Sequence, residues 1–190
     1  MVKVGFVVEG DCEKMLLSSK GFKNWAERHG IETCAVINAC GGSNLCPKNI
    51  EPSIANCRLS NPDKIVVLTD LECEPCITAT KNRIGGNVDH IVVAKKALEA
   101  WFLADTVAMR CWLENDDFQE KAMPEETPNM PWDCIKEIGK NYHKTKRGPG
   151  STRKIFARKM INTFNFSIER AANHPHCPSA KYFLEKLKKL

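Results

Sequence analysis

Carboxylate side chains directly follow an apolar stretch near the start of the chain. The apolar run Val4–Val8 is followed by Glu9, Asp11 and Glu13. A run rich in β-branched residues that stops at a glycine, here Gly10, predicts a buried strand that ends in a turn. Three carboxylates so close to a strand end are candidates for binding a cation.

The same arrangement recurs further along the chain, where Ile65–Leu68 leads to Asp70, Glu72 and Glu74. In an open α/β sheet, chemistry takes place outside the carboxyl ends of the strands. If the two strands are neighbours, Glu9, Asp70 and Glu72 share one crevice. Carboxylates this close repel each other unless a cation lies between them, and hard oxygen ligands suit Mg²⁺ or Mn²⁺.

An alternating pattern of strands and helices is predicted to position these carboxylates. Helical segments, the first at about Glu13–His29, separate four strands: Val4–Val8, Ile31–Asn38, Lys64–Asp70 and Val88–Val93. Strands with helical crossovers predict an α/β fold with a four-stranded, mostly parallel sheet and helices on both faces. We expect seven strand residues to be buried, namely Val4, Phe6, Val8, Ile65, Val67, Ile91 and Val93.

The segment Ala94–Asp105, AKKALEAWFLAD, predicts a helix that begins near Lys95. Glu99, Phe102 and Leu103 are spaced so that they share one face of this helix. With Phe102 and Leu103 packed inward, Glu99 lies at the edge of the packed face, near the top of the sheet. Glu99 is then either a further metal ligand or an ion-pair partner of Lys95.

These stretches together resemble a known family, the TOPRIM domain of topoisomerases, primases, OLD-type nucleases and some RNA-maturing ribonucleases. The resemblance is carried by Glu9-Gly10, by Asp70-Leu71-Glu72 and by EAWFLAD at 99–105. With HPHCPSAKYFLEKL at 174–187, the chain is similar to small stand-alone TOPRIM-like proteins of bacterial and phage genomes. The family has Asp-x-Asp where this chain has Asp70-Leu71-Glu72, so Glu72 keeps the charge and adds one methylene.

The resemblance implies phosphodiester chemistry that depends on Mg²⁺ or Mn²⁺. One or two ions would be held by Glu9, Asp70 and Glu72, with Glu13 and Glu99 as further ligands. A topoisomerase needs a tyrosine nucleophile on a large gate, and a primase needs a template-binding apparatus for which 190 residues leave little room. Hydrolysis of nucleic acid is therefore the activity that we expect.

Two further catalytic roles are predicted for charged residues near these strand ends. Glu9 could act as a general base instead of a ligand, because it lies outside the Asp70–Glu72 pair. Lys95 or Lys96 could neutralise the charge that develops on the phosphate. A separate hypothesis makes Asp70 a phosphoacceptor with Lys95 beside it.

A hypothesis from another class is a binding or regulatory subunit. Relatives of this kind are often paired with a separate ABC-type ATPase in phage-defence or mobile-element gene sets, so the resemblance implies such a partner. The chain has no Gly-x-x-x-x-Gly-Lys-Ser/Thr pattern of its own, which is compatible with a separate ATPase. In this hypothesis the protein binds nucleic acid or the ATPase and is catalytically silent.

The net charge of +5 conceals an uneven distribution. Residues 1–134 carry 14 Lys/Arg and 20 Asp/Glu, whereas residues 135–190 carry 14 Lys/Arg and 3 Asp/Glu. A metal-dependent enzyme that acts on nucleic acid needs both kinds of surface. We predict phosphate contacts at Lys144, Lys146, Arg147, Arg153 and Lys154. The alternative is a set of solvated helix faces that are basic without binding nucleic acid.

The length of 190 residues indicates one domain, with a TOPRIM-like core at about 1–112 and a basic helical extension at about 113–190. Within this extension we predict an exposed loop at Glu114–Pro131. Helices follow at Pro131–Lys140, at Thr152–Phe164 with Ser151 as its cap, and at Pro178–Leu190. We also expect Ser167 and Asp105 to cap the helices that follow them.

The chain has no apolar run of membrane-spanning length and no signal-peptide pattern, so we expect a cytoplasmic protein without membrane contact. The ten cysteines are then expected to be free thiols. Cys73 and Cys76 have the spacing of half a zinc site, but the chain has no second pair of this spacing. Ordinary loop thiols are the preferred interpretation.

Overall fold

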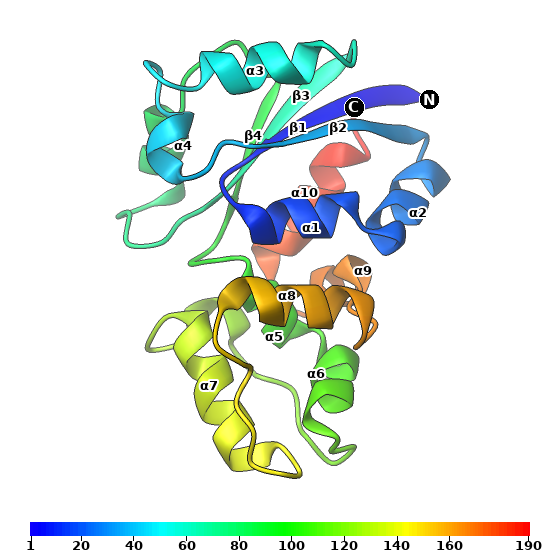
Figure 1. The fold of residues 1–190 in the computed structure, drawn as a ribbon, viewed down its shortest axis with the longest axis vertical. Helices are drawn as coiled ribbons and strands as arrows, with labels where there is room; N and C mark the ends of the chain where they lie inside the picture. Colours follow the sequence, from blue (N-terminus) through cyan, green and yellow to red (C-terminus); the bar gives the residue numbers. More distant parts are fainter.

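Runs of β-branched residues form the parallel sheet that the sequence predicts. The computed structural model describes the whole chain, residues 1–190 (Figure 1). Its four strands are β1 (Val2–Val8), β2 (Ile31–Asn38), β3 (Lys64–Asp70) and β4 (His90–Ala94). They lie in the order β2-β1-β3-β4, and all three neighbouring pairs are parallel. The predicted four-stranded α/β fold is confirmed.

Helices lie between the strands and cover both faces of the sheet. They are α1 (Asp11–Ser18), α2 (Lys20–Arg28), the 3-10 helix η1 (Gly42–Leu45), α3 (Glu51–Arg58) and α4 (Ile77–Arg83). The prediction of a single helix at 13–29 is wrong, because the chain breaks at Ser19. The backbone of Ser19 is extended, and its hydroxyl accepts a hydrogen bond from the Phe22 amide at 3.1 Å, so Ser19 caps a second helix.

Alternate residues of each strand point to opposite faces of the sheet. Phe6 packs towards α1 and α2, whereas Val7 and Val67 pack towards α3. Of the seven strand residues predicted to be buried, six are buried. Ile91 is the exception and is only half-buried, because β4 is an edge strand of the sheet.

The second half of the chain is helical, apart from β4. It contains α5 (Glu99–Ala104), α6 (Thr106–Leu113), the 3-10 helix η2 (Pro124–Glu126), α7 (Pro131–Tyr142), α8 (Arg153–Asn162), α9 (Ile168–Asn173) and α10 (Pro178–Leu187). The helix after β4 does not begin near Lys95, as predicted, but at Glu99. Lys96 adopts a left-handed backbone conformation with φ of 63°, which interrupts a helix before it can form.

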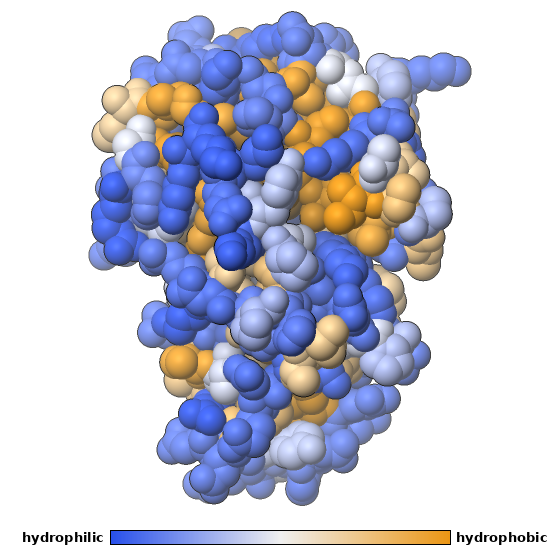
Figure 2. Space-filling view, turned by 180° about the vertical axis from the view of Figure 1, so that it is seen from behind, coloured by the Kyte–Doolittle hydropathy of each residue, from blue (hydrophilic) through white to orange (hydrophobic).

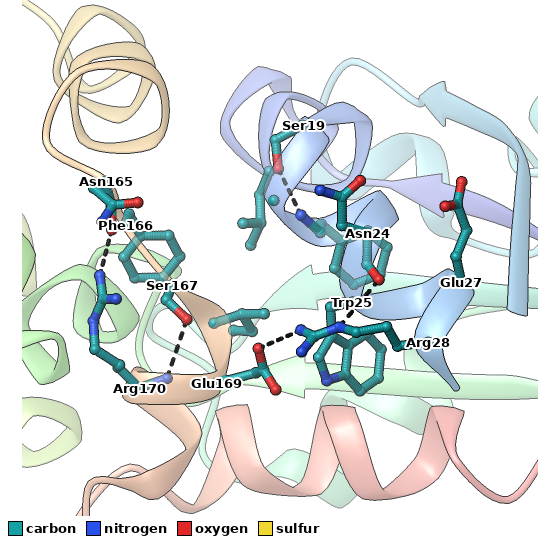
Figure 3. A pocket seen from close by; sticks show the side chains of 14 residues that line it. Ser19, Asn24, Trp25, Glu27, Arg28, Asn165, Phe166, Ser167, Glu169 and Arg170 are labelled. Carbon is teal, nitrogen blue, oxygen red and sulfur yellow. Dashed lines mark hydrogen bonds and ion pairs between the residues drawn. The ribbon is translucent and has the colours of Figure 1, made fainter. Parts of the chain in front are cut away.

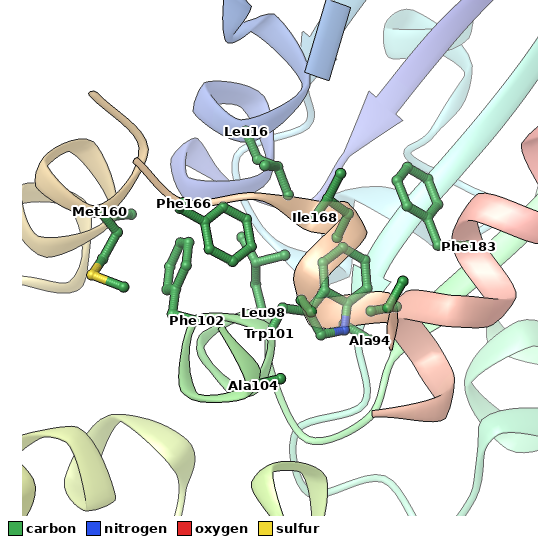
Figure 4. Close-up of a cluster of buried hydrophobic side chains, with 14 of the residues drawn as sticks. Leu16, Ala94, Leu98, Trp101, Phe102, Ala104, Met160, Phe166, Ile168 and Phe183 are labelled. Atoms are coloured by element: carbon green, nitrogen blue, oxygen red, sulfur yellow. The ribbon is translucent and has the colours of Figure 1, made fainter. Parts of the chain in front are cut away.

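The last helix returns to the sheet. Helix α10 lies on the same face of the sheet as α2 (Figure 1), although these helices come from opposite ends of the sequence. The Phe183 ring of α10 lies 6.5 Å from Phe6, 5.9 Å from Phe22 and 5.5 Å from Trp101, measured between ring centroids. One continuous core of 39 buried residues runs through both halves of the chain (Figure 4). The segments before and after residue 112 therefore share one hydrophobic core.

Polar side chains fix the ends of the C-terminal helices. Asp105 caps α6 through the Ala108 amide at 3.2 Å, and Ser167 caps α9 through the Arg170 amide at 3.4 Å, as predicted. The predicted cap of α8 is wrong by one residue, since Thr152 and not Ser151 accepts from the Ile155 amide. None of the helices combines the length and the apolar character needed to cross a membrane.

The position of Phe183 leads to a stability prediction. Phe183→Ala should lower the free energy of unfolding by about 3–5 kcal/mol, because it removes a fully buried ring that joins α10 to the sheet. Chemical denaturation measures this. The neighbouring Tyr182→Ala is the control, since Tyr182 is 38% exposed and its truncation should cost far less. Equal effects of the two substitutions would contradict the packing of α10 on the sheet.

Candidate functional site

The ends of β1 and β3 bring the predicted acidic residues together. The two strands pair in register from Val4 with Lys64 to Val8 with Leu68, so Glu9 and Asp70 follow at the same end of the sheet. The Asp70 amide donates to Glu9 Oε2 at 3.2 Å, and the Thr69 hydroxyl also donates to this oxygen. This placement confirms that Glu9 and Asp70 share the carboxyl edge of the sheet.

A cavity of about 430 Å³ opens at this edge. All five of the predicted metal ligands line it, namely Glu9, Glu13, Asp70, Glu72 and Glu99. Glu9 and Asp70 come from strand ends, Glu13 from α1, Glu72 from the loop after β3 and Glu99 from α5. Glu13, Asp70 and Glu99 are buried, whereas Glu72 is exposed.

Local backbone structure holds three of these side chains. Glu13 is the third residue of α1, and its Oε2 accepts from the Gly10 amide at 3.0 Å, which orders the turn after β1. Asp70 Oδ1 accepts from the Leu98 amide at 2.9 Å and so fixes the start of α5. Glu72 has a left-handed backbone with φ of 48°, and its amide donates to the Lys96 carbonyl at 2.6 Å.

The sequence did not single out Asn38, which lines the cavity, or Gly42, which lies beside Glu9. Asn38 ends β2 and donates to Asp11 Oδ1 at 2.9 Å. Asn38 could have been predicted as a site residue, because it is a polar residue at the carboxyl end of a strand. Gly42 approaches the site so closely that a Cβ there would lie 2.9 Å from Glu9 Oε1. The Gly-Gly sequence of this loop therefore leaves room for the Glu9 carboxylate.

Burial and mutual repulsion both disfavour ionisation of the carboxylates. Burial raises the pKa of Asp70 well above its usual range, and the charges of Glu13, Glu99 and Glu9 raise it further. The pKa of Glu13 is raised to about 7, first by burial and then by Glu9 and Glu99. Burial also raises the pKa of Glu99, although Arg153 opposes this change. The site therefore holds protons that a bound cation would displace.

The first turn of α8 supplies cations at the wall of this cavity. Arg153 lines the cavity, and its Nε lies 3.7 Å from Glu99 Oε1. Lys154 Nζ lies 2.6 Å from Asp11 Oδ2, and this hydrogen bond is the main reason that the pKa of Asp11 is lowered. Two of the five predicted nucleic-acid-binding residues thus lie beside the acidic set.

The other three predicted nucleic-acid-binding residues lie elsewhere. Lys144, Lys146 and Arg147 are exposed on the segment between α7 and α8. Figure 1 shows this segment reaching the end of the molecule opposite the sheet before it returns to α8. The basic residues therefore form two separate groups.

Neither lysine predicted to be catalytic lines the acidic cavity. Lys95 Nζ pairs with Glu126 at 2.7 Å, and Lys96 Nζ donates to the carbonyls of Thr127 and of Asn129, the latter at 3.1 Å. Both lysine side chains therefore contact the segment 126–129 and not the acidic cavity. The alternative in which Lys95 pairs with Glu99 is wrong, because Arg153 holds that position.

Carboxylate oxygens are suitable donors for Mg²⁺, so the acidic set fits a hard cation in donor type. The carboxylates are not, however, arranged as a metal site in this structure. No three His, Cys, Asp or Glu side chains lie so that they could hold a metal ion together. Cys73 and Cys76 are exposed thiols, and the Cys76 Sγ accepts from the Ala79 amide at 3.4 Å, which caps α4.

The largest cavity of the protein lies elsewhere, between α2 and the connection from α8 to α9 (Figure 3). None of the predicted site residues lines it. Arg28 pairs with Glu169 of the same cavity at 2.8 Å, and the Arg170 side chain pairs with Asp105. The lining has two acidic and two basic residues, so it carries no net charge that would attract an ionic substrate.

Comparisons of the chain with models of protein families, with curated proteins and with solved structures found no match. The likeness to TOPRIM proteins therefore stays a prediction from sequence motifs.

The raised pKa of Glu13 leads to a prediction about pH. The folded protein binds this proton more tightly than the unfolded chain does, so stability falls as pH rises from about 4.5 to about 7. Glu13→Gln should flatten this fall and raise the free energy of unfolding at pH 8 by on the order of 2 kcal/mol. Glutamine retains the oxygen that accepts from the Gly10 amide.

Denaturant titrations at several pH values test this. Glu32→Gln is the matched control, because Glu32 is exposed on β2 and lies outside the cavity. Parallel stability curves for wild type and Glu13→Gln would show that Glu13 ionises freely in the folded protein, contrary to the expected proton binding.

Proposed function

We propose that the protein is a metal-dependent phosphodiesterase that hydrolyses nucleic acid with Mg²⁺ or Mn²⁺, in the manner of TOPRIM nucleases. One observation carries the proposal. Six carboxylates, the five predicted ligands and Asp11, line one cavity at the carboxyl edge of a parallel sheet, and the first turn of a basic helix forms part of the same wall. An anionic group with an adjacent cation suits a reaction in which a phosphate must approach metal ligands.

Glu9, Asp70 and Glu72 would hold the ion, with Glu13 and Glu99 as further ligands. When bound, the ion lowers the pKa of a water molecule and neutralises charge on the scissile phosphate. Glu9 is well placed for either of its predicted roles, because Thr69 and the Asp70 amide hold its Oε2, and no hydrogen bond occupies its Oε1. Asp70 is fixed through Oδ1 by the Leu98 amide.

Arg153 and Lys154 would position the nucleic acid in this proposal. Their partners are Glu99 and Asp11, both at the cavity, so a phosphate that displaces these ion pairs comes to lie beside the carboxylates. Both basic side chains are exposed and can therefore turn towards a ligand. Lys144, Lys146 and Arg147 would contact the nucleic acid further from the reacting phosphate.

A second candidate is a catalytically silent subunit that binds nucleic acid or a separate ABC-type ATPase in phage defence. Two observations favour it. No three acidic side chains are arranged to hold a metal ion, and Arg153 already supplies a cation to Glu99. In this alternative Glu72, which is exposed, has no role as a ligand. An activity test with purified components separates the two candidates.

Asp70→Asn is the decisive substitution for the nuclease. It should abolish cleavage of nucleic acid in Mg²⁺ or Mn²⁺, because a neutral amide is a poor ligand for a hard cation. The fold should survive, since the pKa of Asp70 is raised and asparagine resembles the protonated acid. Cleavage assays and calorimetric titration with Mn²⁺ measure the two effects. Asp116→Asn, in an exposed loop, is the control.

Glu72→Asp refines this test, because it creates the Asp-x-Asp of the family and removes one methylene. A direct ligand at this position should give a changed rate or metal preference. Wild-type behaviour would remove Glu72 from the ligand set. If wild type, Asp70→Asn and Glu9→Gln all show the same activity, with and without an ATPase partner, the nuclease proposal fails.

Nucleic-acid binding should depend on both basic groups in different ways. Neutralising Lys144, Lys146 and Arg147 together should weaken binding and reduce its salt dependence, without a change in Mn²⁺ affinity. Arg153→Gln with Lys154→Gln should weaken nucleic-acid binding and strengthen Mn²⁺ binding, because it removes the cations that compete at Glu99 and Asp11.

Fluorescence anisotropy at several salt concentrations and calorimetry with Mn²⁺ measure these effects. Affinity that is unchanged by salt and by all five substitutions would show that the basic residues form a solvated surface.

A further inference from the structure

A second, smaller cavity lies on the far side of β4 from β3. It has a volume of about 260 Å³ and is formed by α4, the end of β4, η2 and the start of α10. None of the carboxylates of the acidic cavity lines it. Its lining combines apolar side chains with a few charged groups, which is the usual composition of a small-molecule site.

Glu125 is the buried charged group of this cavity. Its side chain is 1% exposed, and its Oε1 accepts from the Ser179 amide at 2.9 Å, the Ser179 hydroxyl at 2.5 Å and the Cys177 thiol at 3.2 Å. These contacts cap the first turn of α10. Its Oε2 is buried and has no hydrogen-bond partner. An unpaired buried carboxylate oxygen is unfavourable, so this position calls for a donor from a ligand.

Two lysines lie at the same cavity, and only one of them is neutralised. Lys95 pairs with Glu126 at 2.7 Å. Lys81 has no carboxylate partner: its Nζ donates to the Tyr182 hydroxyl at 3.3 Å and lies 4.9 Å from the centroid of the Tyr182 ring. The cavity therefore presents one unpaired ammonium group and one carboxylate with a free oxygen.

Apolar side chains form the remaining wall, from Ile77, Val93 and Pro178. Ile77 is 38% exposed, which is high for an isoleucine. Figure 2 shows that hydrophobic surface gathers in the half of the molecule that contains the sheet. A ligand with an aliphatic portion would cover this wall.

We propose that this cavity binds a small zwitterion, an α-amino acid with an aliphatic side chain. Its ammonium group donates to Glu125 Oε2, its carboxylate accepts from Lys81, and its side chain packs on Ile77 and Val93. A simple amine would be repelled by Lys81, and a simple carboxylic acid would leave Glu125 Oε2 unpaired. The volume suits a molecule of this size.

Thermal shift and calorimetry with leucine test the proposal on the full chain. Leucine at millimolar concentration should raise the unfolding temperature by mass action. 4-Methylpentanoate, which lacks the ammonium group, and leucinamide, which lacks the carboxylate, should bind about tenfold or more weakly than leucine. Neither measurement uses nuclease activity, so its outcome is separate from that of the proposed function.

Substitutions locate the site. Lys81→Met and Glu125→Gln should each weaken leucine binding about tenfold or more. Lys186→Met is the matched control, because Lys186 also lies over the Tyr182 ring, at 5.7 Å, but does not line the cavity. Lys81 is on the surface of α4, so its variant tests the site even if Glu125→Gln fails to fold. The proposal is overturned if wild type binds none of the three probes, or if Lys81→Met binds leucine as tightly as Lys186→Met does.

Discussion

Asp70 is the residue on which the arrangement of this protein's carboxyl edge depends. Its side chain is buried at the end of β3, where Oδ1 accepts from the Leu98 amide and so sets the start of α5. Its own amide donates to Glu9, which fixes the carboxylate at the end of β1. A group buried this way is stable as a neutral acid or beside a cation, because burial of a lone charge is unfavourable. The start of the helical half is therefore bonded to the carboxylate that burial and the neighbouring carboxylates destabilise most in its ionised form.

Basic residues from helices late in the sequence reduce part of this repulsion between carboxylates. Helix α8 packs along α1 and brings Arg153 to Glu99 and Lys154 to Asp11. Asp105 is buried, and its carboxylate accepts two hydrogen bonds, of 2.8 and 2.9 Å, from the guanidinium group of Arg170 in α9. Three acidic residues, Asp11, Glu99 and Asp105, thus have basic partners from the last 40 residues of the chain. Part of the basic excess of residues 135–190 is therefore used in ion pairs with acidic residues from earlier in the chain. The other basic residues of this segment outnumber its acidic residues.

The sequence was sufficient to predict the strands, their parallel arrangement and the acidic cavity, because each depends on a local pattern: a β-branched run, a helical crossover and a polar residue at a strand end. The features that it could not predict depend on single backbone conformations or on contacts between distant segments. Ser19 could have continued a helix, and its extended backbone splits that helix in two. Lys96 lies in an apparently helical stretch and adopts a left-handed conformation. The sequence did not show that Arg153, among many basic residues, would pair with Glu99, because this contact depends on the packing of α8 against α1.

If the proposed function holds, protons and a metal ion would compete for the same oxygens in the acidic cavity. At neutral pH the raised pKa of Asp70 and the pKa of about 7 for Glu13 mean that the cavity carries less negative charge than its six carboxylates suggest. A divalent cation that binds there must displace these protons, so its affinity should increase with pH. Over the same pH range, mutual repulsion of the ionised carboxylates increasingly destabilises the metal-free fold. A bound cation would therefore stabilise the fold most at the pH values where repulsion between the carboxylates destabilises it most. Under the proposed function, cation binding would thus be coupled to the stability of the site as well as to the charge of a substrate.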